Sequence, residues 1–165
     1  MKNKNYHIRL AKREDAPTCH DLIMELAIFE KAPEKVSNTL AQFTEDGFGK
    51  KPIYHLYVAE WNATKEVVGM ALFVIGYSTW KGKMLYLDDL VVREAYRGNG
   101  IGRALIDKLF EYAQENEVKI VKWQVLDWNE PAIKFYKKLN MTLDAEWIDC
   151  KMQEKGILEW VTSDE

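Results

Sequence analysis

The stretch that decides the fold runs from Met84 to Gly102 and reads MLYLDDLVVREAYRGNGIG. Its first half is apolar and β-branched, as in a buried strand, and Asp88 and Asp89 interrupt it. Its second half contains three glycines, and the apolar spacing after them changes to that of a helix. A strand, a glycine-rich turn and a helix start favour phosphate binding, because backbone N–H groups and the helix dipole point at the anion.

Two common phosphate motifs do not fit this turn. A nucleoside triphosphate loop requires Gly-Lys-Ser/Thr at its end, but Arg103 and Ala104 follow Gly102. The dinucleotide fingerprint G-x-G-x-x-G requires its third glycine where Arg103 stands. The pattern that does fit is Arg97-x-x-Gly100-x-Gly102.

Composition narrows the classes of protein. A chain of 165 residues with 47% apolar and 12% aromatic residues predicts a single globular domain over residues 1–165. The net charge of −3 gives no electrostatic case for nucleic acid and favours a cationic partner. Two cysteines, Cys19 and Cys150, are too few for a disulfide framework and lack metal-ligand spacing. We expect both to be buried thiols in a reducing compartment.

Targeting and membrane signals are weak in this sequence. The longest apolar run, Val67 to Ile75, is too short to span a bilayer. The first five residues lack the apolar core of a signal peptide. The sequence therefore predicts a cytoplasmic protein without a membrane partner.

Hydrophobic periodicity predicts an α/β fold of mixed character. It places helices at 14–30, at 39–47, after the glycine turn from 101, and at 129–139. Thr39 is expected to open the second of these in a capping box with Gln42, and Asn129 to be the N-cap of the last. It places strands at 6–10, 54–60, 67–77, from 84, at 120–125, at 147–152 and at 157–161. Short links predict antiparallel neighbours, whereas the helix between the strands from 84 and 120 predicts a parallel pair. The result is a mostly antiparallel sheet with helices on both faces. Its parallel pair should separate near the turn and leave backbone groups for an amide-bearing ligand.

The turn pattern resembles the acetyl-CoA pyrophosphate loop, Q/R-x-x-G-x-G/A, of the GNAT N-acetyltransferase superfamily. The rest of the chain is similar to the spermidine/spermine (diamine) N-acetyltransferases and their thialysine-acetylating relatives. The stretches that carry this resemblance are 45–49, 52–55, 58–60, 77–89, 96–102 and 128–136. It implies a GNAT-like fold, acetyl-CoA as cofactor, and a homodimer formed through the C-terminal strands.

The resemblance also implies a set of cofactor-binding residues. The backbone of Leu90, Val91 and Val92 would pair with the pantetheine arm and the thioester carbonyl. The pyrophosphate would lie in the turn formed by Arg97, Gly98, Asn99, Gly100, Ile101, Gly102 and Arg103. The far wall would consist of Asn129, Glu130, Pro131 and Ala132. No metal site is expected.

Tyr136 matches the family's general acid. It lies seven residues after Asn129, two helical turns, so the two side chains share a helix face. A tyrosine of pKa ~10 is a weaker acid than a thiol of pKa ~8.5, so full proton transfer costs about 2 kcal/mol. We therefore expect Tyr136 to donate a hydrogen bond to the leaving sulfur. The alternative is a buried aromatic residue with a structural hydroxyl.

An acceptor for the amine proton is also required, since an amine of pKa ~10.4 is protonated at neutral pH. Asp88 matches the family's acidic position and is predicted to take the proton. The family usually has the longer glutamate there, so a bridging water is expected. Regular strand alternation would point Asp89 to the opposite face, as a structural or ion-paired group.

Substrate residues are implied less directly. Glu30 matches an acidic residue that this branch uses against the distal ammonium of a polyamine, and Phe29 precedes it; the alternative is a solvated helix end. Lys122, Trp123 and Gln124 match strand positions on the substrate side, or they are sheet packing. The sequence departs from the branch at Ile28, where lysine is usual, and at Leu139, where arginine is usual.

The leading hypothesis is an enzyme that acetylates a primary amine of a small cationic molecule by direct transfer. A protein-lysine or aminoglycoside-type acetyltransferase is the first alternative. The second is an acyl-CoA-binding sensor without turnover. Thiol release from acetyl-CoA with a panel of amines separates the three.

Overall fold

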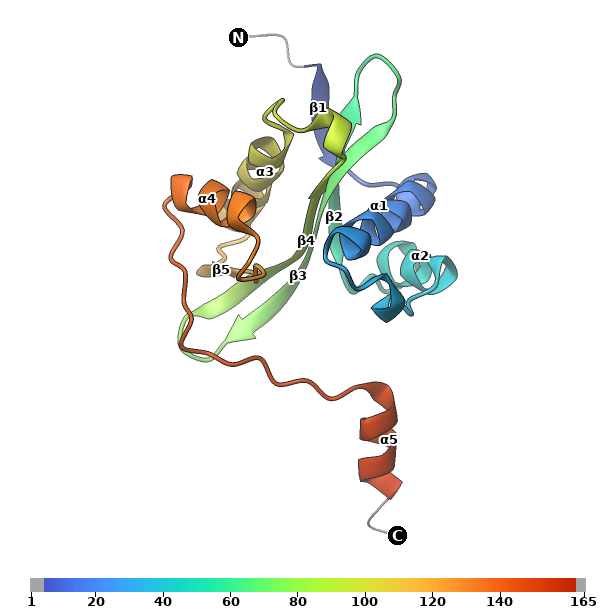
Figure 1. Ribbon diagram of the computed structural model, residues 1–165, viewed down its shortest axis with the longest axis vertical. Coiled ribbons are helices and arrows are strands. Elements are labelled where there is room, and N and C mark those ends of the chain that lie inside the picture. The colour runs from blue at the N-terminus through green and yellow to red at the C-terminus, as the bar shows by residue number, and fades with distance from the viewer. Residues whose placement is uncertain (1–4, 163–165) are drawn as a thin grey trace. The chain divides into compact units, whose positions relative to one another are not determined.

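The computed structural model describes residues 5–162 (Figure 1). Contacts group the chain into two compact units, residues 1–124 and residues 125–165, and each is described by itself. The prediction of one domain over the whole chain stays a prediction.

The first unit is built on a five-stranded sheet in the order β1-β2-β3-β4-β5. The strands are β1 (Tyr6–Leu10), β2 (His55–Trp61), β3 (Val67–Ser78), β4 (Gly82–Val92) and β5 (Ile120–Lys122). Strands β1 to β4 pair antiparallel with one another in this order, and β5 pairs parallel with β4. This mixed, mostly antiparallel sheet confirms the predicted fold class. Strand β5 is shorter than predicted, because its pairing with β4 ends at Tyr86 and Lys122.

Helices cover both faces of this sheet. Helices α1 (Ala16–Phe29) and α2 (Leu40–Phe48) lie on one face, and α3 (Ile101–Glu115) lies on the other (Figure 1). Short 3-10 turns, η1 (Arg13–Asp15), η2 (Pro33–Lys35) and η3 (Glu94–Tyr96), join these elements. Thr39 caps α2 as predicted, since its Oγ1 accepts a hydrogen bond from the Gln42 N–H at 3.2 Å. The Gln42 side chain binds Asp46 instead of completing the capping box.

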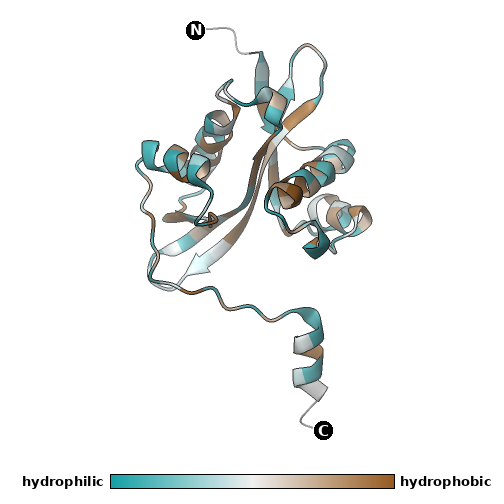
Figure 2. Ribbon diagram, in the orientation of Figure 1, coloured by the Kyte–Doolittle hydropathy of each residue, from teal (hydrophilic) through white to brown (hydrophobic). Residues whose placement is uncertain are grey.

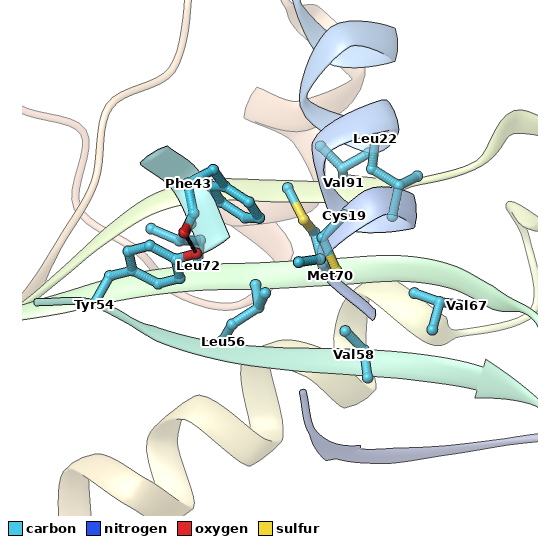
Figure 3. Packing of buried hydrophobic residues seen from close by; sticks show 11 residues of the cluster. Cys19, Leu22, Phe43, Tyr54, Leu56, Val58, Val67, Met70, Leu72 and Val91 are labelled. Carbon is cyan, nitrogen blue, oxygen red and sulfur yellow. Dashed lines mark hydrogen bonds between the residues drawn. The ribbon is translucent and has the colours of Figure 1, made fainter. Parts of the chain in front are cut away.

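The core between the sheet and helices α1 and α2 is apolar. Figure 3 shows its packing, which joins Cys19, Leu22, Phe43, Tyr54, Leu56, Val58, Val67, Met70, Leu72 and Val91. Hydrophobic residues, drawn in brown, concentrate on the central strands, whereas the helices carry both hydrophobic and hydrophilic residues (Figure 2). The burial of Cys19 raises the pKa of its thiol to about 12, so this cysteine is an inert packing group.

One polar contact lies inside this core. The Tyr54 hydroxyl donates a 2.6 Å hydrogen bond to the Phe43 carbonyl, and the two rings stack at 5.2 Å (Figure 3). We expect Tyr54→Phe to lower the free energy of unfolding by about 1–3 kcal/mol, because the buried carbonyl loses its donor. Chemical denaturation measures this, and the exposed Tyr77→Phe is the matched control. Equal stability of the two variants would contradict the prediction.

The second unit contains α4 (Glu130–Lys138) and α5 (Glu154–Thr162). The predicted helix at 129–139 is confirmed, with Asn129 as its N-cap. The two predicted C-terminal strands are wrong: residues 147–152 have no regular structure, and α5 replaces the strand at 157–161. Short apolar runs fit either periodicity, and no strand between residues 125 and 162 offers them a ladder. Cys150, predicted to be buried, is exposed in this segment.

In the part of the chain that is described, no helix is both long and apolar enough to span a bilayer.

Candidate functional site

The glycine turn joins η3 to α3 and has the backbone geometry that an anion site requires. Gly98 and Gly100 both adopt a φ of +79°, which L side chains rarely occupy. Gly100 is the N-cap of α3, and no side chain caps this helix end. The first turn of α3 contains no acidic residue. Its N–H groups and the positive end of the helix dipole are therefore suited to a negative ligand.

The two arginines of the turn are held by neighbouring groups. Arg97 donates from Nε to the Val92 carbonyl at 3.0 Å. Arg103 donates from Nε to Asp107, one turn along α3, at 2.6 Å. Asn99 donates from its amide to the Tyr96 carbonyl at 3.0 Å, which fixes the middle of the turn.

Before the turn, β4 continues beyond its parallel neighbour. Pairing with β5 is confined to Met84–Tyr86, whereas pairing with β3 continues to Val92. Residues Leu90–Val92 therefore lie on a stretch of β4 that β5 does not pair. This is the predicted separation of the parallel strands, and it leaves a backbone edge next to the turn.

A β-bulge interrupts β4 at the two aspartates. Leu87 pairs with Phe73 and Asp89 pairs with Leu72, so Asp88 is the extra residue. Leu72 belongs to the core beneath α1, and facing residues of a ladder share a face, so Asp89 lies on the α1 side. Regular alternation fails at this position. Strand alternation therefore does not determine how Asp88 and Asp89 point relative to each other.

The charge of Asp89 interacts with two other carboxylates, Asp88 and Glu30. The pKa of Asp89 is raised to about 7 by burial first, and then by the charges of Asp88 and Glu30. Loss of solvent also raises the pKa of Asp88, although its side chain is exposed. None of the cations between residues 5 and 162 lowers either pKa. This acidic cluster, Glu30, Asp88 and Asp89, is a local region of negative potential.

The end of α1 adds to that potential. Glu30 is the C-cap of α1, and the last turn of this helix has no basic residue. The helix dipole therefore adds partial negative charge beside the carboxylate. Phe29, the last residue of α1, lies under the Arg97 guanidinium, 5.9 Å from the ring centroid. The structure thus brings a predicted substrate residue into contact with a predicted cofactor residue.

Of the three residues predicted on the strand at 120–125, Lys122 is the last residue of β5, and Trp123 and Gln124 follow it. Lys122 is exposed and pairs with Tyr86 at the end of the parallel ladder. Trp123 is half-buried, and Gln124 accepts a 3.1 Å hydrogen bond from the Tyr86 hydroxyl. Gln124 therefore ties the end of β5 to β4.

The second unit positions the remaining predicted residues. The Asn129 side chain accepts a hydrogen bond from the Ala132 N–H at 3.3 Å, and Pro131 lies in the first turn of α4. Tyr136 is buried in the last part of this helix, and burial raises the pKa of its hydroxyl. Its carbonyl accepts hydrogen bonds from the Leu139 and Met141 N–H groups. Two turns therefore separate Asn129 from Tyr136 on one helix face, as predicted.

Across residues 5–162, no three His, Cys, Asp or Glu side chains are arranged to hold a metal ion.

Sequence comparison assigns the class of protein. The model of the acetyltransferase (GNAT) family matches residues 18–141. The chain belongs to this family and is an N-acetyltransferase.

Two relatives define the branch. The thialysine N-epsilon-acetyltransferase of Bos taurus is 42% identical over 138 residues, which cover 80% of this chain and 81% of that protein. The spermidine/spermine N(1)-acetyltransferase-like protein 1 of Homo sapiens is 33% identical over 162 residues, 93% of this chain but 23% of that protein. The resemblance to this branch is confirmed.

The fold also has solved counterparts. An integron cassette protein from the mobile metagenome of V. cholerae matches with a TM-score of 0.78 over 96% of this chain and 98% of that chain. At 20% sequence identity, this likeness concerns the fold alone.

Proposed function

We propose that this enzyme transfers the acetyl group of acetyl-CoA directly to a primary amine of a small cationic substrate. The observation that carries the proposal is the acidic cluster next to the glycine turn. Burial and like charge hold the pKa of Asp89 at about 7, and a bound cation would relieve that repulsion. The relatives named for thialysine and for spermidine/spermine support the same substrate class.

The cofactor would bind along β4 and across the turn. Residues Leu90–Val92 offer the backbone edge that β5 leaves unpaired, which suits the amides of a pantetheine arm. Residues Arg97–Arg103 would hold the pyrophosphate, mainly through backbone N–H groups of the first turn of α3. Residues Asn129–Ala132 would form the opposite wall.

The acidic cluster would perform the first chemical task, which is removing a proton from the substrate ammonium. Asp88 is exposed and would accept this proton, directly or through water. Asp89 is less exposed than Asp88 and would raise the negative potential near it. Burial raises the pKa of Asp88, and a carboxylate with a raised pKa is better matched to this task than an ordinary aspartate.

Tyr136 would perform the second task, which is stabilising the departing thiolate. Burial raises the pKa of its hydroxyl, which keeps the proton on oxygen and available as a hydrogen-bond donor. The hydroxyl would donate a hydrogen bond to the sulfur as the thiolate leaves.

Substrate selection would depend on a second positive charge. A diamine or a lysine analogue carries one amine to be acetylated and another cationic group. Glu30, at the negative end of α1, is suited to hold the distal cation, with the Phe29 ring packing on the connecting chain. Lys122, Trp123 and Gln124 would line the same side.

A panel of amines tests this function. Thiol release from acetyl-CoA would be measured with thialysine, putrescine, spermidine, a lysine-containing peptide and an aminoglycoside. We expect the highest kcat/KM with a small amine that carries a second charge. Preference for the peptide or the aminoglycoside would support the alternative enzyme classes. Tight coenzyme A binding without thiol release for any amine would support a sensor.

The turn gives a prediction about cofactor binding. At Gly98 an added Cβ meets nothing within 4 Å, so only the positive φ opposes a side chain. Valine is strongly disfavoured there, whereas asparagine tolerates this region. We expect Gly98→Val to raise the KM for acetyl-CoA about tenfold, for a strain of roughly 1–2 kcal/mol. Gly98→Asn, of similar size, should raise it far less. Equal effects of the two variants would contradict the prediction.

The assembly and the compartment stay predictions. We propose a homodimer, in which a second copy covers the apolar side chains of the C-terminal segment; Trp147, Ile148 and Trp160 are 74%, 89% and 70% exposed. The molar mass in solution, measured by light scattering, tests this. A cytoplasmic location is likewise proposed.

A further inference from the structure

Arg93 lies at the junction between β4 and the segment that leads to the turn. Its backbone N–H donates to the Val68 carbonyl of β3 at 2.9 Å, immediately after the last residue of β4. Its side chain is 23% exposed and lies between two carboxylates. Nε donates to Glu25 of α1 at 3.1 Å, and Nη1 donates to Glu66 in the link between β2 and β3. One guanidinium therefore joins three elements of the first unit.

Glu66 extends this contact to η3. Its second carboxylate oxygen accepts a 3.1 Å hydrogen bond from the Tyr96 hydroxyl. That hydrogen bond raises the pKa of Tyr96 and keeps its hydroxyl protonated. The Tyr96 ring packs edge-on against the Trp61 ring at 5.0 Å between centroids. The backbone N–H of Trp61 donates to the Glu66 carbonyl at 2.8 Å. Glu66 is thus fixed by its backbone and by both carboxylate oxygens.

Tyr96 connects these contacts to the glycine turn. Its carbonyl accepts the 3.0 Å hydrogen bond from Asn99, which lies between the two glycines of positive φ. A continuous series of hydrogen bonds therefore runs from α1 through Arg93, Glu66 and Tyr96 to Asn99. The turn itself is exposed and rich in glycine, so it gains little rigidity from its own side chains.

We propose that Arg93 and Glu66 are positioning residues, which hold the turn Arg97–Arg103 in its anion-binding conformation. Neither residue need touch the cofactor. Charge-assisted hydrogen bonds to a planar guanidinium are strong and directional, so they suit this task. Preorganising a loop improves affinity by reducing the entropy that binding would otherwise remove. This inference rests on the proposed function of the turn as the cofactor site.

The first test compares two arginines of the same unit. Arg9 also bridges two carboxylates, Asp15 at 2.7 Å and Glu60 at 2.8 Å, but its contacts lead to β2 and η1. We expect Arg93→Met to raise the KM for acetyl-CoA about tenfold, which corresponds to about 1.4 kcal/mol, with kcat within twofold. Arg9→Met should lower the melting temperature without raising this KM. Equal changes in KM for the two variants would overturn the proposal.

The second test reports on the turn without any cofactor. Hydrogen exchange of the amides between residues 94 and 103 should accelerate in Arg93→Met and in Glu66→Gln, but not in Arg9→Met. Unchanged exchange there would overturn the positioning role, even in a protein that proves not to bind coenzyme A. Absence of coenzyme A binding by the unmodified protein would instead contradict the proposed function. A failure of the positioning role and a failure of the proposed function are therefore distinguishable.

A double-mutant cycle tests the route through Glu66. Arg93→Met and Tyr96→Phe both remove a donor to this carboxylate. If they act on the turn through Glu66, the combined rise in KM should be smaller than the product of the single effects. If the two rises in KM multiply independently, the proposed route from Arg93 through Glu66 to the turn is overturned. The mild Tyr96→Phe change keeps the ring that packs on Trp61, so the cycle does not depend on a disruptive variant.

Discussion

Replacing Tyr136 with phenylalanine is expected to lower kcat about a hundredfold, with a much smaller change in the KM for acetyl-CoA. The substitution removes one hydroxyl and leaves the buried ring in place. A hydrogen bond to a developing anion is stronger in the transition state than in the ground state. Its loss therefore appears in kcat, in the range seen when one such donor is removed from an active site.

The control for this experiment is the same chemical change elsewhere. Tyr112 of α3 is half-buried, and its ring packs against Phe73 and His55. Tyr112→Phe should leave kcat within a factor of about two, while a Tyr136 variant of equal thermal stability loses activity. A Tyr136→Phe enzyme with unchanged kcat would remove this residue from the mechanism and favour its structural alternative.

Local signals in the sequence predicted much of the first unit. The glycine turn was recognisable because positive φ at Gly98 and Gly100 requires that residue type, and the helix begins where the apolar period changes. Thr39 and Asn129 cap their helices as predicted, because a capping side chain acts within three residues of its partner. Such features depend on neighbours in the chain and can be read from it.

Features that depend on distant pairing were not predictable in this way. The bulge at Asp88 arises from the register between β3 and β4, so strand alternation could not predict the relative directions of Asp88 and Asp89. The role of Arg93 depends on Glu66, which lies 27 residues earlier, and no local pattern links them. The only hint of the bulge in the sequence was the pair of adjacent acidic residues in an otherwise apolar strand. Of the two strand-like runs near the C-terminus, the one at 157–161 formed a helix and the one at 147–152 no regular structure, because a strand needs a partner that the sequence does not specify.

The stability of the enzyme should depend on Asp89 and on pH. A pKa of about 7 in the folded protein exceeds the ordinary value of 3.8, so the folded state binds the extra proton. The stability from this proton is fully present below pH ~4 and is lost as the pH rises through 7. We expect Asp89→Asn to raise the melting temperature at pH 8 and to have little effect at pH 4. Asp107→Asn, on the exposed surface of α3, is the control for loss of one carboxylate.

Asp88 and Asp89 should differ sharply in their effects on catalysis. Asp88→Asn removes the proposed proton acceptor and is expected to lower kcat/KM by a factor of about 10²–10⁴ at neutral pH. The acidic limb of its pH–rate profile should disappear. Asp89→Asn keeps the acceptor, and burial is what raises the pKa of Asp88, so the acidic limb should stay where it is, with a smaller loss of kcat. If Asp89→Asn instead abolishes the limb and Asp88→Asn keeps it, Asp89 is the base. Asp89, whose pKa is raised by both Asp88 and Glu30, is the alternative acceptor that this comparison tests.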